Sequence, residues 1–78
     1  MSVTSAQIRA ARAMLRWSAE ELARRADVGI QTVKRFELSS GVPPNRSSTL
    51  EKVIGTLESA GIEFIGSPED GPGIRLRR

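Results

Sequence analysis

The chain has 78 residues and contains neither cysteine nor histidine. Without cysteine there are no disulfides and no thiol nucleophile, and without histidine there is no Ser-His-Asp triad. Zinc and most other transition metals lose their commonest ligands too, so we expect no metal site and no cofactor. Adjacent carboxylates without a nucleophile or a metal cluster do not make an active site, so we do not expect an enzyme.

Long apolar runs and aromatic residues are also scarce. No run approaches the roughly 20 residues of a membrane span, and Met1–Gln7 lacks the basic-then-apolar pattern of a signal peptide. We therefore expect a soluble cytoplasmic protein without a membrane partner. The aromatic residues are Trp17, Phe36 and Phe64. They occupy core-like positions, as Leu22 does, so stacked binding of single-stranded nucleic acid is unsupported.

The composition that remains is typical of one small globular domain, with 38% hydrophobic residues. A core of this size supplies only about 3–5 kcal/mol, so we expect stability from well-packed helices or from self-association. The net charge of +3 is uneven, because residues 1–46 carry +4 and residues 47–70 carry −4. This asymmetry indicates either a surface that meets a polyanion or an ordinary solvated surface.

Hydrophobic periodicity predicts four helices and one hairpin. Capping boxes at Thr4–Gln7 and Ser18–Glu21 mark the first two helix starts. The predicted helices cover Ser5–Arg16, Ala19–Ala26, Ile30–Leu38 and the stretch from Ser48 to just before Gly61. Alternating residues then predict strands over Ile62–Ile65 and Gly73–Arg77, joined by the loop Gly66–Pro72.

The second and third predicted helices are short and are joined by the tight turn Asp27–Gly29. Two such helices, the second with an exposed polar side, are the pattern of a helix-turn-helix. In this arrangement the first helix crosses the DNA backbone, and the second places its first turn against base edges in the major groove.

A set of residues at fixed spacing carries a family resemblance: Trp17–Ala23, Ala26–Gly29, Thr32–Glu37, Leu50 and Ile54. Through them the stretch Ile8–Leu57 resembles the phage-repressor-type (XRE-type) helix-turn-helix family. The segments Gly41–Pro44, Gly61–Ile65 and Gly71–Leu76 are similar to a compact bacterial regulator subgroup with a C-terminal hairpin. The resemblance implies a mainly α fold, with a four-helix helix-turn-helix domain over 1–61 and a short antiparallel β-hairpin over 62–78 as an element of the same domain.

The resemblance implies that residues 30, 31, 34 and 35 contact the bases. The chemistry of each side chain suggests its role. Gln31 can pair with adenine and Arg35 with guanine, Lys34 can reach guanine or a phosphate, and Ile30 can touch a thymine methyl group. A solvated helix surface would carry the same polar residues.

Phosphate contacts position a protein on DNA rather than specify sequence. Ser18 is a candidate because it stands at a helix N-terminus, where it can also be a plain cap. Further candidates are Arg9, Arg16, Asn45 and Arg46, each of which is otherwise ordinary surface.

Two residues have a structural role by resemblance. Arg12, in the first helix, is expected to pair with Glu37 at the end of the third, which would tie the reading helix to the scaffold. Arg12 can also approach a phosphate, but we favour the structural role.

The sequence departs from the family pattern at four positions. Ala19 stands where the family commonly has a glutamine that clamps a phosphate. Arg16 replaces a glycine that closes the first helix, at some backbone strain, and Asp27 and Gly29 replace the usual glycine and serine of the turn.

A lone two-stranded hairpin is marginal in water, so this one must pack on its own helices or pair with another chain. Ile62, Phe64, Ile74 and Leu76 can cover one of its faces, whereas Ile65 points elsewhere. We expect a homodimer in which the hairpin, alone or together with the fourth helix, makes much of the contact. Two reading helices would then lie about 34 Å apart and match a palindromic site.

The leading hypothesis is a sequence-specific regulator of double-stranded DNA, most simply a repressor, which acts at the nucleoid. No small-molecule ligand is evident, so control would come from concentration, self-binding or a regulatory protein partner. The alternative is a protein-interaction module, antitoxin-like or an anti-activator, that uses the same scaffold to bind another protein. Ile30 and Ala19 favour the alternative slightly, whereas Gln31, Lys34 and Arg35 favour DNA.

Overall fold

The computed structural model describes residues 3–38 and 48–77. Over these residues the chain forms a small, mostly helical domain of four helices and a two-stranded antiparallel hairpin. In chain order the elements are α1 (Ser5–Met14), α2 (Ala19–Ala26), α3 (Ile30–Leu38), α4 (Ser48–Ser59), β1 (Ile62–Ile65) and β2 (Gly73–Leu76). The mainly α class with a C-terminal hairpin, predicted from periodicity, is therefore confirmed.

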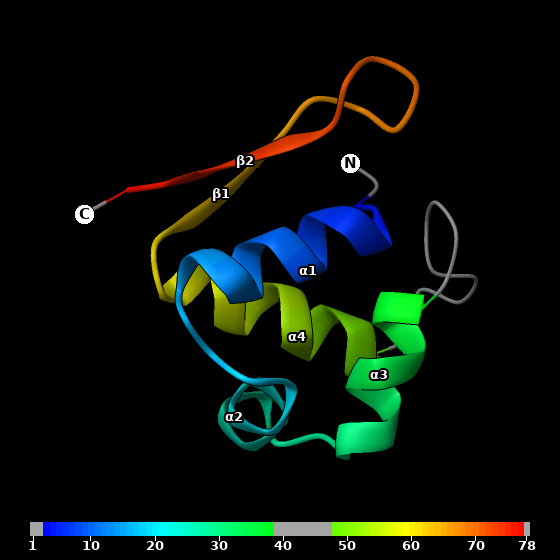
Figure 1. Ribbon diagram of the computed structural model, residues 1–78, viewed down its shortest axis with the longest axis vertical. Helices are drawn as coiled ribbons and strands as arrows, with labels where there is room; N and C mark the ends of the chain where they lie inside the picture. The colour runs from blue at the N-terminus through cyan, green and yellow to red at the C-terminus, as the bar shows by residue number, and fades with distance from the viewer. Residues whose placement is uncertain (1–2, 39–47, 78) are drawn as a thin grey trace.

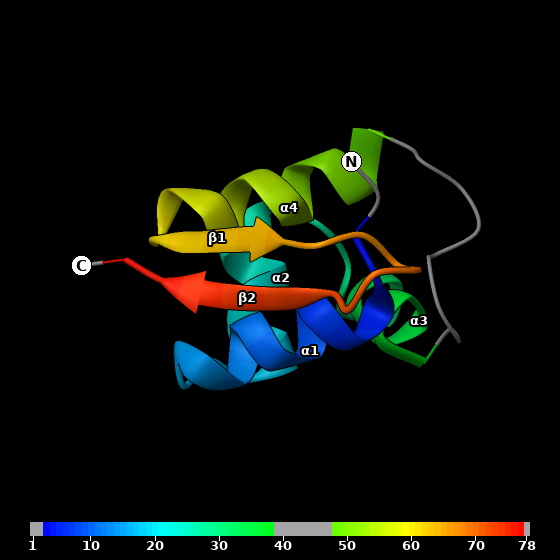
Figure 2. The same ribbon diagram turned by 90° about the horizontal axis from the view of Figure 1, so that it is seen from above.

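The elements form three layers (Figure 1). The hairpin lies on one side of the molecule, α1 and α4 form the middle, and α2 and α3 lie on the side away from the hairpin. Seen from above, β1 runs along the α4 side and β2 along the α1 side (Figure 2). The hairpin therefore covers the seam between α1 and α4 and leaves α3 uncovered by it.

The core is one apolar cluster to which every helix and β1 contribute buried side chains. Ile8, Leu22, Val33 and Leu57 have no exposed surface. Phe36 is also buried, so the core role expected of it and of Leu22 is confirmed. Trp17 differs from the expectation, because it is only partly buried and packs against the edge of this cluster.

The first helix ends at Met14 and not at the predicted Arg16. Arg16 donates its backbone N–H to the Ala13 carbonyl, and Trp17 donates to the Arg12 carbonyl, which together make a Schellman motif. This motif needs a left-handed residue, and Arg16 has φ 61°. The left-handed backbone that makes an arginine costly at a glycine position is therefore present, and this conformation ends the helix before Arg16.

The hairpin pairs Ile62 with Leu76 and Phe64 with Ile74, which puts these four apolar side chains on one face. Ile62 and Phe64 are buried in the core, and their partners pack against it. Ile65 is on the other face and is exposed, as expected. The hairpin thus caps its own helices, one of the two roles considered for it, and its part in a dimer stays a prediction.

Candidate nucleic-acid interface

The third helix has two sides of opposite character. Val33 is fully buried and Phe36 is buried beside it, while Gln31, Lys34 and Arg35 are exposed on the other side. Residues that are three or four positions apart share a helix face, so the exposed residues form one continuous polar strip. The half-buried Ile30 begins this strip, and the four residues predicted to contact bases lie together on it.

The predicted ion pair between α1 and α3 is present. Arg12 donates from Nε to Glu37 Oε2 at 2.7 Å and from Nη2 to Oε1 at 2.9 Å, a two-point contact. The hydrogen bonds with Glu37 raise the pKa of the Arg12 guanidinium. Arg12 Nη1 also donates to the Trp17 carbonyl at 3.0 Å, which ties the end of α3 to the chain entering α2.

Arg9 adds a second tie from α1 to the same place. Its guanidinium donates to the main-chain carbonyl of Glu37, near the C-terminus of α3, where helix carbonyls lack helical partners. Two side chains from α1 therefore hold the last turn of α3, one through the carboxylate and one through the backbone.

The turn between α2 and α3 is set by two special residues. Asp27 ends α2 in the left-handed region, at φ 57° and ψ 49°, and Val28 completes the turn by donating to the Ala23 carbonyl at 3.0 Å. Gly29 then precedes α3, and its carbonyl accepts a hydrogen bond from the Thr32 amide at 3.1 Å. Gly29 therefore occupies the N-cap position of α3. Glycine has no side-chain acceptor, so the start of α3 lacks a capping side chain.

The described residues among those predicted to contact phosphate lie on different elements. Ser18 caps α2, with its hydroxyl accepting from the Glu21 amide at 3.0 Å. Arg16 is exposed two residues before Ser18, and Arg9 lies on α1 with its guanidinium at the end of α3. Asn45 and Arg46 lie outside the described residues. Phosphate contact by any of them stays a prediction.

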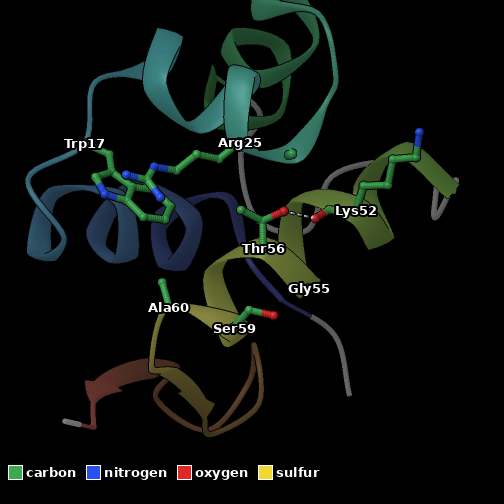
Figure 3. Close-up of a pocket in the computed structure, with 8 residues that line it drawn as sticks. Trp17, Arg25, Lys52, Gly55, Thr56, Ser59 and Ala60 are labelled. Atoms are coloured by element: carbon green, nitrogen blue, oxygen red, sulfur yellow. Dashed lines mark hydrogen bonds between the residues drawn. The ribbon is translucent and has the colours of Figure 1, made fainter.

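A shallow groove of about 670 Å³ runs between α2 and α4 (Figure 3). Trp17 lies on its α2 side with the Arg25 guanidinium 4.4 Å from the ring centre, a cation–π contact. Gly55 opens the α4 side, because no described heavy atom beyond its own helix backbone lies within 4 Å of where a Cβ would sit. The glycine inside α4 thus has no close-packing role among the described residues.

Glu21, in the first turn of α2, pairs with Arg25, which lines this groove. Its carboxylate accepts from Arg24 at 2.6 Å and from Arg25 at 2.5 Å. The hydrogen bonds from Arg24 first and then Arg25 lower the pKa of Glu21. The side chain that was expected to complete a capping box at Ser18 is therefore occupied by the two arginines.

Gln7 has a role that its sequence pattern did not predict. It forms the expected capping box with Thr4, with a 2.8 Å bond from the Thr4 amide to its Oε1. Its Nε2 also donates to the Ile65 carbonyl at 3.1 Å and the Gly73 carbonyl at 2.8 Å, bridging both strands of the hairpin. Gln7 is only 3% exposed, and a glutamine buried to this extent needs hydrogen-bond partners in the protein. The sequence does not show that Gln7 is buried, so it could not predict these partners.

Within residues 3–38 and 48–77, no helix is long and apolar enough to cross a membrane. The same residues contain no group of acidic side chains placed to hold a metal ion. No protein-family model matches the chain, and no curated protein matches it significantly.

Proposed function

We propose that the chain is a sequence-specific double-stranded DNA-binding regulator of the phage-repressor-type helix-turn-helix kind. In this proposal α2 and α3 form the helix-turn-helix, and α3 enters the major groove. A two-fold dimer reads a palindromic operator, and covering a promoter makes the protein a repressor.

The observation that supports this proposal best is the two-sided character of α3. Its buried residues fix it to the domain, and its exposed strip carries Gln31, Lys34 and Arg35 with no acidic residue among them. The major groove, about 12 Å wide, accepts one α-helix of about 10–12 Å diameter. The hairpin lies on the other side of the molecule and leaves this strip accessible (Figure 1).

The side chains of the strip suggest distinct roles. Gln31 offers an amide that pairs through two hydrogen bonds with adenine, and the fork of Arg35 fits guanine in the same way. Lys34 carries a point charge that suits guanine or a phosphate oxygen. Ile30, which is half-buried, provides an apolar contact for a thymine methyl group.

Rigid support of α3 matters for this mechanism, because base pairing by side chains requires a fixed register. The contacts of Arg12 and Arg9 with Glu37 hold the C-terminal turn of α3 against α1. Glu37 neutralises the Arg12 charge, so we assign Arg12 to support and leave DNA attraction to the exposed cations.

The test is selection of bound sequences from a randomised duplex by the full chain, followed by sequencing. We expect a palindromic motif that the double variant Gln31→Ala/Arg35→Ala no longer enriches. The matched control is Lys52→Ala, which removes one positive charge from an exposed position on α4, and we expect it to enrich the same motif.

Other outcomes separate the alternatives. Binding with a steep salt dependence but no enriched motif would mean that only phosphates are held and would contradict sequence-specific reading. No binding near physiological salt would favour a protein-interaction module instead. The 85% exposed Leu38 at the end of α3 would then be the first residue to probe.

A further inference from the structure

The outer edge of β2 has backbone groups that point away from β1. Arg77 donates its N–H to the Gly61 carbonyl at 2.7 Å, which makes these two a hydrogen-bonded pair. Such pairs alternate along an antiparallel ladder, so Gly73 also faces β1, whereas Ile74 and Leu76 face outward. No hydrogen bond within the described part of the chain takes up these outward groups.

A small hollow of about 170 Å³ lies between this edge and α1. Ala6 and Ala10, both exposed, form its α1 side, and Ile74 contributes from β2. No charged side chain is among the described residues that line it, which are Thr4, Ala6, Gln7, Ala10, Pro72, Gly73 and Ile74. The space beside the edge is therefore uncharged, mostly apolar and open.

The arginines of β2 are drawn away from this edge. Glu63 on β1 accepts from Arg75 at 3.0 Å and from Arg77 at 2.8 Å. Both guanidinium groups are therefore held toward β1. Charged side chains on an edge strand normally prevent pairing between molecules, and here they are directed elsewhere.

The edge of β1 has the opposite character. The hollow beside it is lined by Glu58 and Glu63, together with Arg77. Two copies that met along β1 would bury the exposed Glu58 carboxylate, which has no arginine partner among the described residues, and this is unfavourable. Of the two edges, β2 is the one that can approach its own copy without burying acidic charge.

We propose that the edge of β2 and the adjoining Ala6–Ala10 side of α1 bind a second copy of this chain across a two-fold axis. The two β2 strands pair antiparallel with Ile74 opposite Ile74, which makes a four-stranded sheet. This inference rests on the dimer of the proposed function and names its interface.

Charge selects this register. With Ile74 opposite its own copy, Arg75 faces Gly73 of the second copy, which has no side chain. Registers shifted toward the C-terminal end of β2 would place Arg75 opposite Arg75 or Arg77, and like charges directly opposite each other destabilise a sheet. The two Ile74 side chains then lie over the alanines of α1 and fill the two hollows.

The first test is sedimentation equilibrium of the full chain. We expect a dimer, and we expect Ala10→Glu to weaken dimerisation by about a hundredfold, because it places a carboxylate in an apolar interface. Ser59→Glu adds the same charge to an exposed position on α4 and should leave the dimer unchanged. Circular dichroism checks that both variants stay folded.

The register has its own test, because the chain has no natural cysteine. Cα atoms of directly opposite residues lie about 4.5–5.5 Å apart, within the range of a disulfide. Ile74→Cys should therefore cross-link the dimer under mild oxidation, and Arg75→Cys should cross-link far more slowly. Equal cross-linking of the two variants would overturn the register.

A monomer at high micromolar concentration, or a dimer unaffected by Ala10→Glu, would overturn the interface. DNA binding is measured separately on one half of the selected site, so the two proposals can fail independently. A dimer that does not bind duplex DNA contradicts the proposed function and leaves this interface standing. A monomer that binds a half-site contradicts this interface and the dimeric form of the proposed function, but leaves DNA reading by α3 standing.

Discussion

Two residues with side chains end helices in the left-handed region, where glycine is usual. Arg16 closes α1 at φ 61° and Asp27 closes α2 at φ 57°. Asp tolerates this conformation better than most residues, since its short polar side chain can bond locally. Arginine has no such compensation, so Arg16 is the more costly of the two.

We predict that Arg16→Gly stabilises the protein. The left-handed conformation costs an L-residue about 1–2 kcal/mol, and glycine avoids this cost. Glycine also raises the entropy of the unfolded chain, which cancels about 0.4–1 kcal/mol of the gain in stability. The net gain in the free energy of unfolding should be up to about 1 kcal/mol, measured by urea denaturation. Arg16→Ala is the control, since it removes the charge but keeps the strain. An equal gain from alanine would show that charge, not backbone conformation, is responsible.

Among the elements, α1 has side chains that hydrogen-bond to both the hairpin and α3. Its first turn holds the hairpin through Gln7, and its later turns hold α3 through Arg9 and Arg12. Each of these contacts spans a long separation in sequence, so each fixes the position of one element against another.

The ion pair between α1 and α3 should be costly to break from one side. Glu37 is only 7% exposed, so Arg12→Ala would leave a buried carboxylate without its partner. We expect a loss of about 2–4 kcal/mol in the free energy of unfolding. The double variant Arg12→Leu/Glu37→Met removes both charges and should recover most of it. A double variant as unstable as Arg12→Ala would mean that packing, not the unpaired charge, sets the cost.

The hairpin clamp can be separated from the helix cap by one substitution. Gln7→Glu keeps an acceptor for the capping box, in which glutamate is a common residue, but an ionised glutamate cannot donate to the carbonyls of Ile65 and Gly73. We expect a loss of about 1–3 kcal/mol at neutral pH. The loss should shrink as the pH falls, because a protonated glutamate can donate again. A loss that is independent of pH in thermal unfolding would contradict this account of the clamp.

The outer face of the hairpin should contribute an acid-sensitive part of the stability. Hydrogen bonds from Arg77 first and then Arg75 lower the pKa of Glu63. A carboxylate whose pKa is lower in the folded state stabilises the fold above its ordinary pKa, and this stabilisation disappears as the pH falls through the folded-state value. Glu63→Gln should therefore lower the unfolding temperature at neutral pH but not at strongly acidic pH. An equal decrease at both would show that the charge is not involved.

For the whole molecule, local patterns in the sequence were sufficient to predict the elements. The bounds of α2 and α3 follow from Ser18 and from the glycine and aspartate of the turn, which act over a few residues. Contacts between distant segments were harder to predict. The pair of Arg12 and Glu37 was expected only from a family resemblance.

Other contacts had no local signal at all. The sequence pattern predicts Gln7 only as a capping residue. Its hydrogen bonds to the hairpin depend on how the hairpin packs on α1. The sequence pattern predicts Trp17 as a core residue. In the structure the groove beside Gly55 leaves it partly exposed, with Arg25 over its ring. Such features depend on packing between elements, which periodicity does not specify.

We propose above all that the exposed side of α3 reads double-stranded DNA. The most direct measurement is an NMR titration of the isotope-labelled chain with a duplex, following every backbone amide at physiological salt. We predict the largest changes at residues 30–35 and at the start of α2, with the outer face of the hairpin unaffected. An unchanged α3, or changes confined to the hairpin or to the groove between α2 and α4, would contradict the account.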